Sequence, residues 1–225
     1  MIRMKNLLRT LLVTVLAVVV LSACSGGPSE SAPASAPPTT TGATYVADVE
    51  ADGKKMAIGI TVDGDQIAAY ACNGADDEAW FFGQQAGGRV DVVNKFRDTL
   101  TASLTLENVT GNVVMNGTNY AFTAPKVAAP AGIYTADQDG VRASWIVRPD
   151  GSATGVQFNG GITGRDFEQA ELQQLNAAQF QAQVRNKRVL QQADQSVSLK
   201  NGTLISKING RGVTARTVTG TTRFG

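Results

Sequence analysis

Apolar and polar residues alternate along most of the chain between about residues 43 and 160. Leu100, Ala102, Leu104 and Leu106 alternate with threonines and a serine, so one face of this segment is apolar and the other polar. Residues 56–62 show the same period of two. Asp-Gly and Asn-Gly pairs, which favour tight hairpin turns, separate the runs at positions 52–53, 63–64, 73–74, 116–117, 139–140, 150–151 and 159–160.

These runs predict an antiparallel meander. The expected strands span residues 45–50, 56–62, 66–72, 78–83, 89–93, 99–106, 112–115, 119–124, 132–136, 142–148 and 153–158. A meander of this length should curl until few strand edges remain exposed. We therefore expect a mainly β fold whose meander closes into a small barrel or sandwich.

The segment from Asp166 to about Gln192 has a helical period instead. Asp166 is a suitable N-cap, and basic residues near the end of the segment complement the helix dipole. At 100° per residue one face collects the following apolar side chains: Phe167, Leu175, Ala178, Ala182 and Val189. The pattern predicts one helix over about 166–192, packed on the barrel. Alternation resumes at about 196–218 around Asn201-Gly202 and Asn209-Gly210, which predicts terminal strands.

The N-terminus is typical of an export signal, with three basic residues followed by an apolar run over residues 10–20. That run is shorter than the ~20 residues that a membrane-spanning helix needs. Leu21-Ser22-Ala23-Cys24 resembles the lipobox of bacterial lipoproteins. The resemblance implies removal of residues 1–23, acyl chains such as palmitate on Cys24, and a protein anchored in the cell membrane at its extracytoplasmic face. An ordinary secretory signal, cleaved further along, is the alternative.

Residues 24–42 are almost entirely Ser, Gly, Pro, Ala and Thr after the cysteine, a composition that buries too little apolar surface to fold. We interpret them as a tether of about 60 Å when extended, with a glycosylated stalk as the alternative. Residues 43–225 then form the folded β-barrel-like domain.

Composition narrows the function. The chain has no histidine, which removes the commonest general base and the usual serine and cysteine triads. It has 20 basic and 19 acidic residues, and loss of the leader's three basic residues leaves 17 against 19. This balance gives no electrostatic reason to bind nucleic acid. Once Cys24 is lipidated, Cys72 is the one remaining thiol, and we interpret it as a small buried residue.

The candidate ligand or partner surface lies around residues 76–82. Asp76, Asp77 and Glu78 form an acidic run directly before the aromatic residues Trp80, Phe81 and Phe82. Since neighbouring strand residues point to opposite faces, at least one of these rings must pack outside the barrel core or lie exposed. The bland alternative is a charged hairpin loop without a ligand.

Several short sequence motifs resemble those of small exported β domains in actinobacterial envelope proteins of unassigned function. They include Ala69–Gly74, Ala79–Gly83 and Trp145–Gly151. With the lipobox, this resemblance implies a small barrel-like β domain on a lipid tether and indicates no ligand. The function that we favour is a non-enzymatic binding or scaffold module without a cofactor, whose partner is an envelope protein or a small apolar ligand. Two alternatives stay open. One is a carrier of an apolar ligand or lipid in the barrel interior, and the other is a hydrolase that uses two carboxylates ~5–10 Å apart.

Overall fold

The computed structural model describes residues 42–200 and 203–224. The leader, the Leu21–Cys24 motif, the tether up to residue 41 and the Asn201-Gly202 turn lie outside the described residues. Among the described residues, no helix has the length and apolar character required to cross a membrane.

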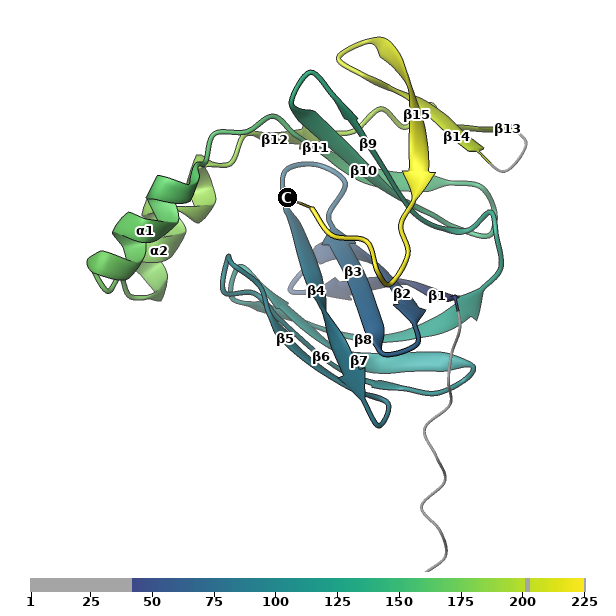
Figure 1. Cartoon of the computed structure of the whole chain (residues 1–225), viewed down its shortest axis with the longest axis horizontal. Coiled ribbons are helices and arrows are strands. Elements are labelled where there is room, and N and C mark those ends of the chain that lie inside the picture. The colour runs from purple at the N-terminus through teal and green to yellow at the C-terminus, as the bar shows by residue number, and fades with distance from the viewer. Residues whose placement is uncertain (1–41, 201–202, 225) are drawn as a thin grey trace, which may run out of the picture. The chain divides into compact units, whose positions relative to one another are not determined.

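The first part of the domain is a closed antiparallel barrel in which each strand pairs with the next (Figure 1). Pairing of Thr44 with Val127 and of Tyr45 with Lys126 joins the last strand to the first. The strands are β1 (Ala43–Ala51), β2 (Lys54–Asp63), β3 (Gln66–Cys72), β4 (Glu78–Ala86), β5 (Arg89–Val93), β6 (Thr99–Leu104), β7 (Asn108–Met115) and β8 (Thr118–Val127). The predicted mainly β class and barrel closure are therefore confirmed.

The remaining strands form a second sheet of seven strands, in the order β12-β11-β10-β9-β15-β14-β13. It contains β9 (Gly132–Gln138), β10 (Val141–Val147), β11 (Ala153–Phe158), β12 (Leu190–Gln192), β13 (Ser198–Lys200), β14 (Thr203–Ile208) and β15 (Arg211–Thr217). Its first hairpin repeats that of the barrel. Tyr-x-Ala-Asp occurs at 45–48 and 134–137, and a left-handed Asp-Gly turn follows at 52–53 and 139–140.

One apolar cluster fills the barrel, a second joins the barrel to the second sheet, and a third, which includes Trp145 and Leu204, packs on the second sheet itself. Side chains fill the barrel interior, and Tyr45, Ile58 and Phe81 there are fully buried. The second cluster, the joint, packs the outer face of β2–β4 against Ile133 and Ile146 of the second sheet. The expectation that the other face of residues 56–62 is polar and exposed to solvent is therefore wrong. Ala57 and Thr61 on that face are both 3% exposed, because they pack in the joint. The single predicted strand over 99–106 also ends early, and Leu106 lies beyond it, 54% exposed.

Gly59 permits the close approach at the joint. A Cβ on this residue would lie 2.6 Å from the Ile133 side chain, so any larger residue would displace that side chain from the joint.

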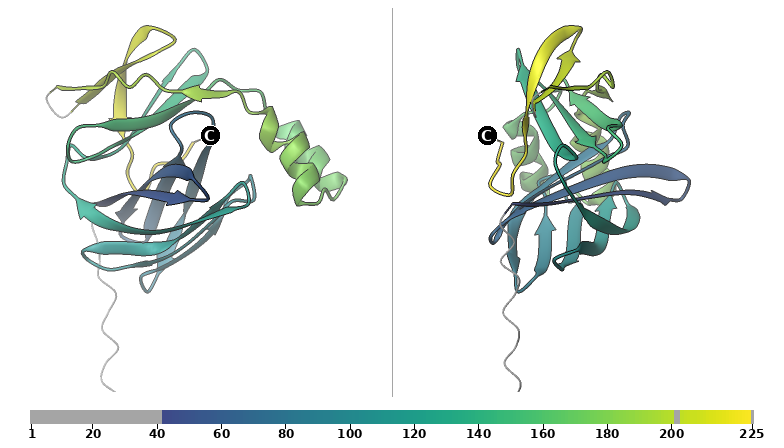
Figure 2. Two further views of the ribbon diagram at one scale, coloured as in Figure 1. Left: turned by 180° about the vertical axis from the view of Figure 1, so that it is seen from behind. Right: turned by 90° about the vertical axis from the view of Figure 1, so that its right-hand side faces the viewer.

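The predicted helix over 166–192 is wrong in its extent. The segment forms two short helices, α1 (Gly164–Leu172) and α2 (Ala177–Gln183), which lie side by side in Figures 1 and 2, followed by a 3-10 turn at Arg185–Lys187. Gln174 has a φ of 50°, which ends the first helix and reverses the chain. Thr163 is the N-cap and Asp166 its capping-box partner. Leu175 is buried as predicted, but Ala178 and Ala182 are exposed.

Candidate functional site

The aromatic residues of β4 point in the two directions expected of a strand. Phe81 lies in the barrel core, whereas Trp80 and Phe82 pack outside the barrel in the joint. Trp80 stacks on Tyr70 with the ring centres 4.4 Å apart. The C-terminal tail (residues 218–224) crosses this face, and Phe224 meets Trp80 edge-on at 4.7 Å. Trp80 is therefore only 9% exposed, and the expected ligand surface around it is covered by the chain itself.

The three acidic residues of the run have three different environments. Asp76 is exposed, and its carboxylate accepts a hydrogen bond from the Asn73 side chain at 2.8 Å. Asp77 accepts from two arginines, and Glu78 lies beneath the surface, 3% exposed. Glu78 accepts hydrogen bonds from the Tyr70 hydroxyl at 3.0 Å and from Arg142. The run is therefore not a uniformly solvated loop.

Asp77 belongs to a buried ion-pair cluster that joins the helical segment to the barrel. Arg185 donates to Asp77 at 2.7 Å and to Asp98 at 2.5 Å, and Arg188 donates to Asp77 at 3.1 Å. The side chains of Arg185, Asp98 and Arg188 are 2%, 4% and 5% exposed. Two carboxylates thus converge, as a hydrolase would need, but Arg185 lies between them and Arg188 also pairs with Asp77, so two arginines balance the two charges.

Beside this cluster lies a cavity of about 550 Å³, which we call the mouth cavity because barrel-core side chains form its floor. Met56, Met115 and Tyr120 provide that floor. The walls come from the start of β2, the β3–β4 loop, the β7–β8 turn and α2 with its following turn. Their polar members are Lys54, Lys55, Asn73, Asp76, Asp77, Asn116, Thr118, Gln181, Arg185, Asn186 and Arg188.

Several polar groups of the mouth cavity have little to bind within the protein. Among the described residues, the Lys55 ammonium and the Asn116 side chain form no hydrogen bond, and Lys54 reaches the Thr118 hydroxyl only at 3.4 Å. Burial raises the pKa of the Tyr120 hydroxyl above the usual value and outweighs the opposite effect of the neighbouring Thr118 hydroxyl. The Tyr120 hydroxyl therefore stays protonated and available as a donor.

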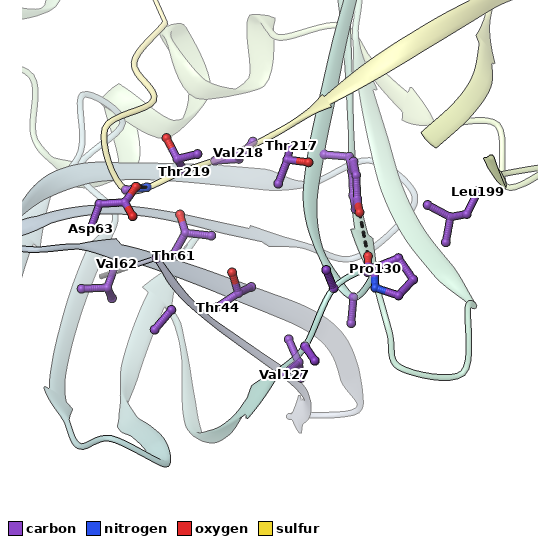
Figure 3. Close-up of a pocket in the computed structure, with 17 residues that line it drawn as sticks. Thr44, Thr61, Val62, Asp63, Val127, Pro130, Leu199, Thr217, Val218 and Thr219 are labelled. Carbon is purple, nitrogen blue, oxygen red and sulfur yellow. Dashed lines mark hydrogen bonds between the residues drawn. The ribbon is translucent and has the colours of Figure 1, made fainter. Parts of the chain in front are cut away.

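A second cavity, of about 620 Å³, opens at one end of the joint, and we call it the joint cavity. Figure 3 shows Thr44, Thr61 and Val62 of the barrel on one side and Pro130 and Leu199 on the other. Most residues that line it are apolar or glycine, and the Tyr134 hydroxyl already donates to the Pro130 carbonyl at 2.7 Å. It begins at Gly42, the first described residue.

Cys72 is fully buried, as predicted, and burial raises the pKa of its thiol to about 12. A thiol with so high a pKa is a poor nucleophile near neutral pH.

The fold belongs to the class of closed eight-stranded antiparallel barrels, here joined to a seven-stranded sheet. The mouth cavity is polar, the joint cavity is mainly apolar, and both lie outside the side chains that fill the barrel. A comparison of the chain with protein families, with curated proteins and with solved structures finds no match in any of the three.

Of the residues that the sequence indicated, Asp76 and Asp77 line the mouth cavity, and its other polar groups were not among those candidates. Arg185 and Asp98 are 87 positions apart, and no local pattern connects them. Lys54 and Lys55 carried a signal, since two adjacent lysines directly after a hairpin turn concentrate positive charge at one end of a strand.

Proposed function

We propose that this protein is a non-enzymatic binding module of the bacterial cell envelope, held by lipid on Cys24 at the extracytoplasmic face of the membrane. The observation that carries the binding role is the mouth cavity, where Lys55, Asn116 and Tyr120 present polar groups with little or no internal partner. Pockets of ~300–1,000 Å³ with a few convergent polar groups are the usual sites for small ligands. The neutralised Asp77 and Asp98 pair favours binding over carboxylate catalysis.

Anchoring is tested by replacing each cysteine in turn. Cys24→Ala should move the protein from the membrane fraction to the soluble fraction, because the diacyl group with an added amide-linked chain supplies the two anchors that stable attachment needs. Cys72→Ala is the matched control and should remain in the membrane fraction. A wild-type protein that carries no lipid by mass spectrometry and fractionates as soluble would refute this part of the proposal.

Binding is tested by thermal unfolding of the full chain in detergent against a collection of small polar molecules, since a ligand of the folded state raises the midpoint. Gln181→Trp places an indole in the mouth cavity and should abolish the rise, whereas Gln183→Trp, exposed on the same helix, should keep it. If no compound raises the midpoint, or if both variants respond alike, the site is wrong.

The joint cavity favours one second candidate, a carrier of an apolar ligand. This ligand would lie between the sheets rather than in the barrel interior, which side chains fill. A fluorescent fatty acid should then bind the full chain, and Val127→Glu should weaken its binding by placing a charge in the cavity wall. Val114→Glu, on an exposed face of the same barrel, serves as the control. Equal binding by both variants would exclude the joint cavity.

A further inference from the structure

We infer that the ligand of the mouth cavity is a sugar ring that carries an anionic group, either a carboxylate or a phosphate. The inference rests on the proposed binding function and specifies its ligand class. Three features of the cavity support it: the balance of charge, the kinds of polar group, and the floor.

Charge selects the anionic group. Four cations and two carboxylates line the cavity. Arg185 and Arg188 are satisfied by Asp77, and Arg185 also by Asp98 behind the wall. Lys54 and Lys55 are the lining cations that form no ion pair with a described carboxylate. An anion placed beside these two ammonium groups gains charge-assisted hydrogen bonds without displacing an existing ion pair.

The remaining polar groups suit hydroxyls. Carboxamides and hydroxyls both donate and accept, which is what a ring bearing several hydroxyl groups requires. Asn116, Thr118 and Tyr120 lie on the β7–β8 hairpin, opposite Gln181 and Asn186 from the helical side. Gln181 already donates to the Asn186 side chain at 3.0 Å, but the Asn116 side chain forms no internal hydrogen bond among the described residues. A purely apolar ligand would leave Asn116 and the unused donors and acceptors of the other groups desolvated without partners, which is unfavourable. A simple inorganic anion would leave most of them unused.

The floor supplies a non-polar face. Met56, Met115 and Tyr120 are 3%, 1% and 3% exposed, so they offer a narrow apolar contact at the base of the cavity. The carbon-bound hydrogens of a sugar ring form apolar faces that can pack against such side chains while the hydroxyls at the ring edge reach the walls. The volume of about 550 Å³ leaves room for one or two rings.

Isothermal titration of the full chain in detergent tests the inference with five probes: glucuronic acid, glucose 6-phosphate, glucose, acetate and inorganic phosphate. At least one of the two charged sugars should bind, and glucose should bind about tenfold more weakly, the equivalent of one charge-assisted contact. Binding of glucuronic acid alone assigns a carboxylate, and binding of glucose 6-phosphate alone assigns a phosphate. Acetate or phosphate binding as tightly as the charged sugars would overturn the sugar assignment, and so would glucose binding equally well.

Two conservative variants locate the binding. Lys55→Gln should weaken the charged sugar about tenfold and leave glucose unchanged, with exposed Lys126→Gln as the control. Tyr120→Phe should weaken it about three- to tenfold. Its control is Tyr45→Phe, which removes a hydroxyl bonded to the Thr105 carbonyl, away from the cavity. Unchanged binding in both cavity variants would overturn the inference. If the polar collection yields another ligand that Gln181→Trp abolishes, the proposed function stands without this ligand class.

Discussion

Arg185→Met tests whether the buried ion-pair cluster fixes the helical segment to the barrel. The substitution keeps most of the side-chain volume but removes the charge between Asp77 and Asp98, whose side chains are 18% and 4% exposed. Breaking a buried ion pair by removing one partner destabilises a protein by about 3–5 kcal/mol, because the other charge stays buried.

The structure places the expected loss near the lower end of that range. Asp98 retains hydrogen bonds from the Asn94 side chain at 3.2 Å and from the Asn116 backbone N–H at 3.3 Å. Asp77 retains Arg188. We therefore expect a loss of about 3 kcal/mol, which for a domain of this size lowers the melting midpoint by roughly 6–12 °C.

The assay is thermal and urea unfolding followed by circular dichroism and tryptophan emission. Arg211→Met is the matched control, because Arg211 and its partner Asp139 are each 71% exposed, and its effect should stay within about 1 kcal/mol. Adding Asp98→Leu to Arg185→Met should recover part of the loss by removing the stranded charge. If Arg185→Met has the same melting midpoint as the Arg211→Met variant, the cluster does not hold the helical segment.

Three further predictions concern single side chains. Leu175→Asp should lower the free energy of unfolding by about 3 kcal/mol, since Leu175 is 8% exposed among apolar neighbours, and an unchanged melting midpoint would mean that the helices do not pack as described. The Cys72 thiol has its ordinary pKa of 9.0 in the unfolded chain but a pKa of about 12 in the folded protein, so the free energy of unfolding should fall as pH rises from 9 to 12. The fall should be less steep in Cys72→Ala. Equal slopes of the two proteins in urea unfolding across this pH range would contradict the prediction. Phe224→Ala should expose Trp80 and shift tryptophan emission to the red. The shift reports on Trp80, because Trp145 is fully buried elsewhere. An unshifted spectrum would mean that the tail does not cover Trp80.

Local pattern predicted the strands well, because each depends on neighbours in sequence. The predicted limits of β3, β5 and β11 coincide with those observed, and Asp52-Gly53 forms the expected left-handed turn. The helical segment was harder, since its apolar residues fit one continuous face although Gln174 reverses the chain. Residues 166–192 contain no proline or glycine that would indicate the end of a helix.

Contacts between distant segments could not be predicted in this way. The meander closes after β8, and pairing of Thr44 and Tyr45 with residues more than 80 positions away leaves no local signal. Burial of the outer face of β2 follows from a sheet that comes later in the chain. Its small residues Ala57 and Gly59 were visible in the sequence, but small residues suit a barrel interior equally well.

The seam between β1 and β8 has a mechanical consequence. β1 pairs with β2 over nine residue positions but with β8 over only two, and those two, Thr44 and Tyr45, lie at the N-terminal end of β1. In the anchored protein that we propose, tension between envelope and membrane would enter the domain at Gly42 and load this seam first. The β1–β2 hairpin would resist in shear, with many hydrogen bonds sharing the force, while the short seam opened. Stretching would thus break the β1–β8 pairing and open the barrel before force was transmitted to the second sheet.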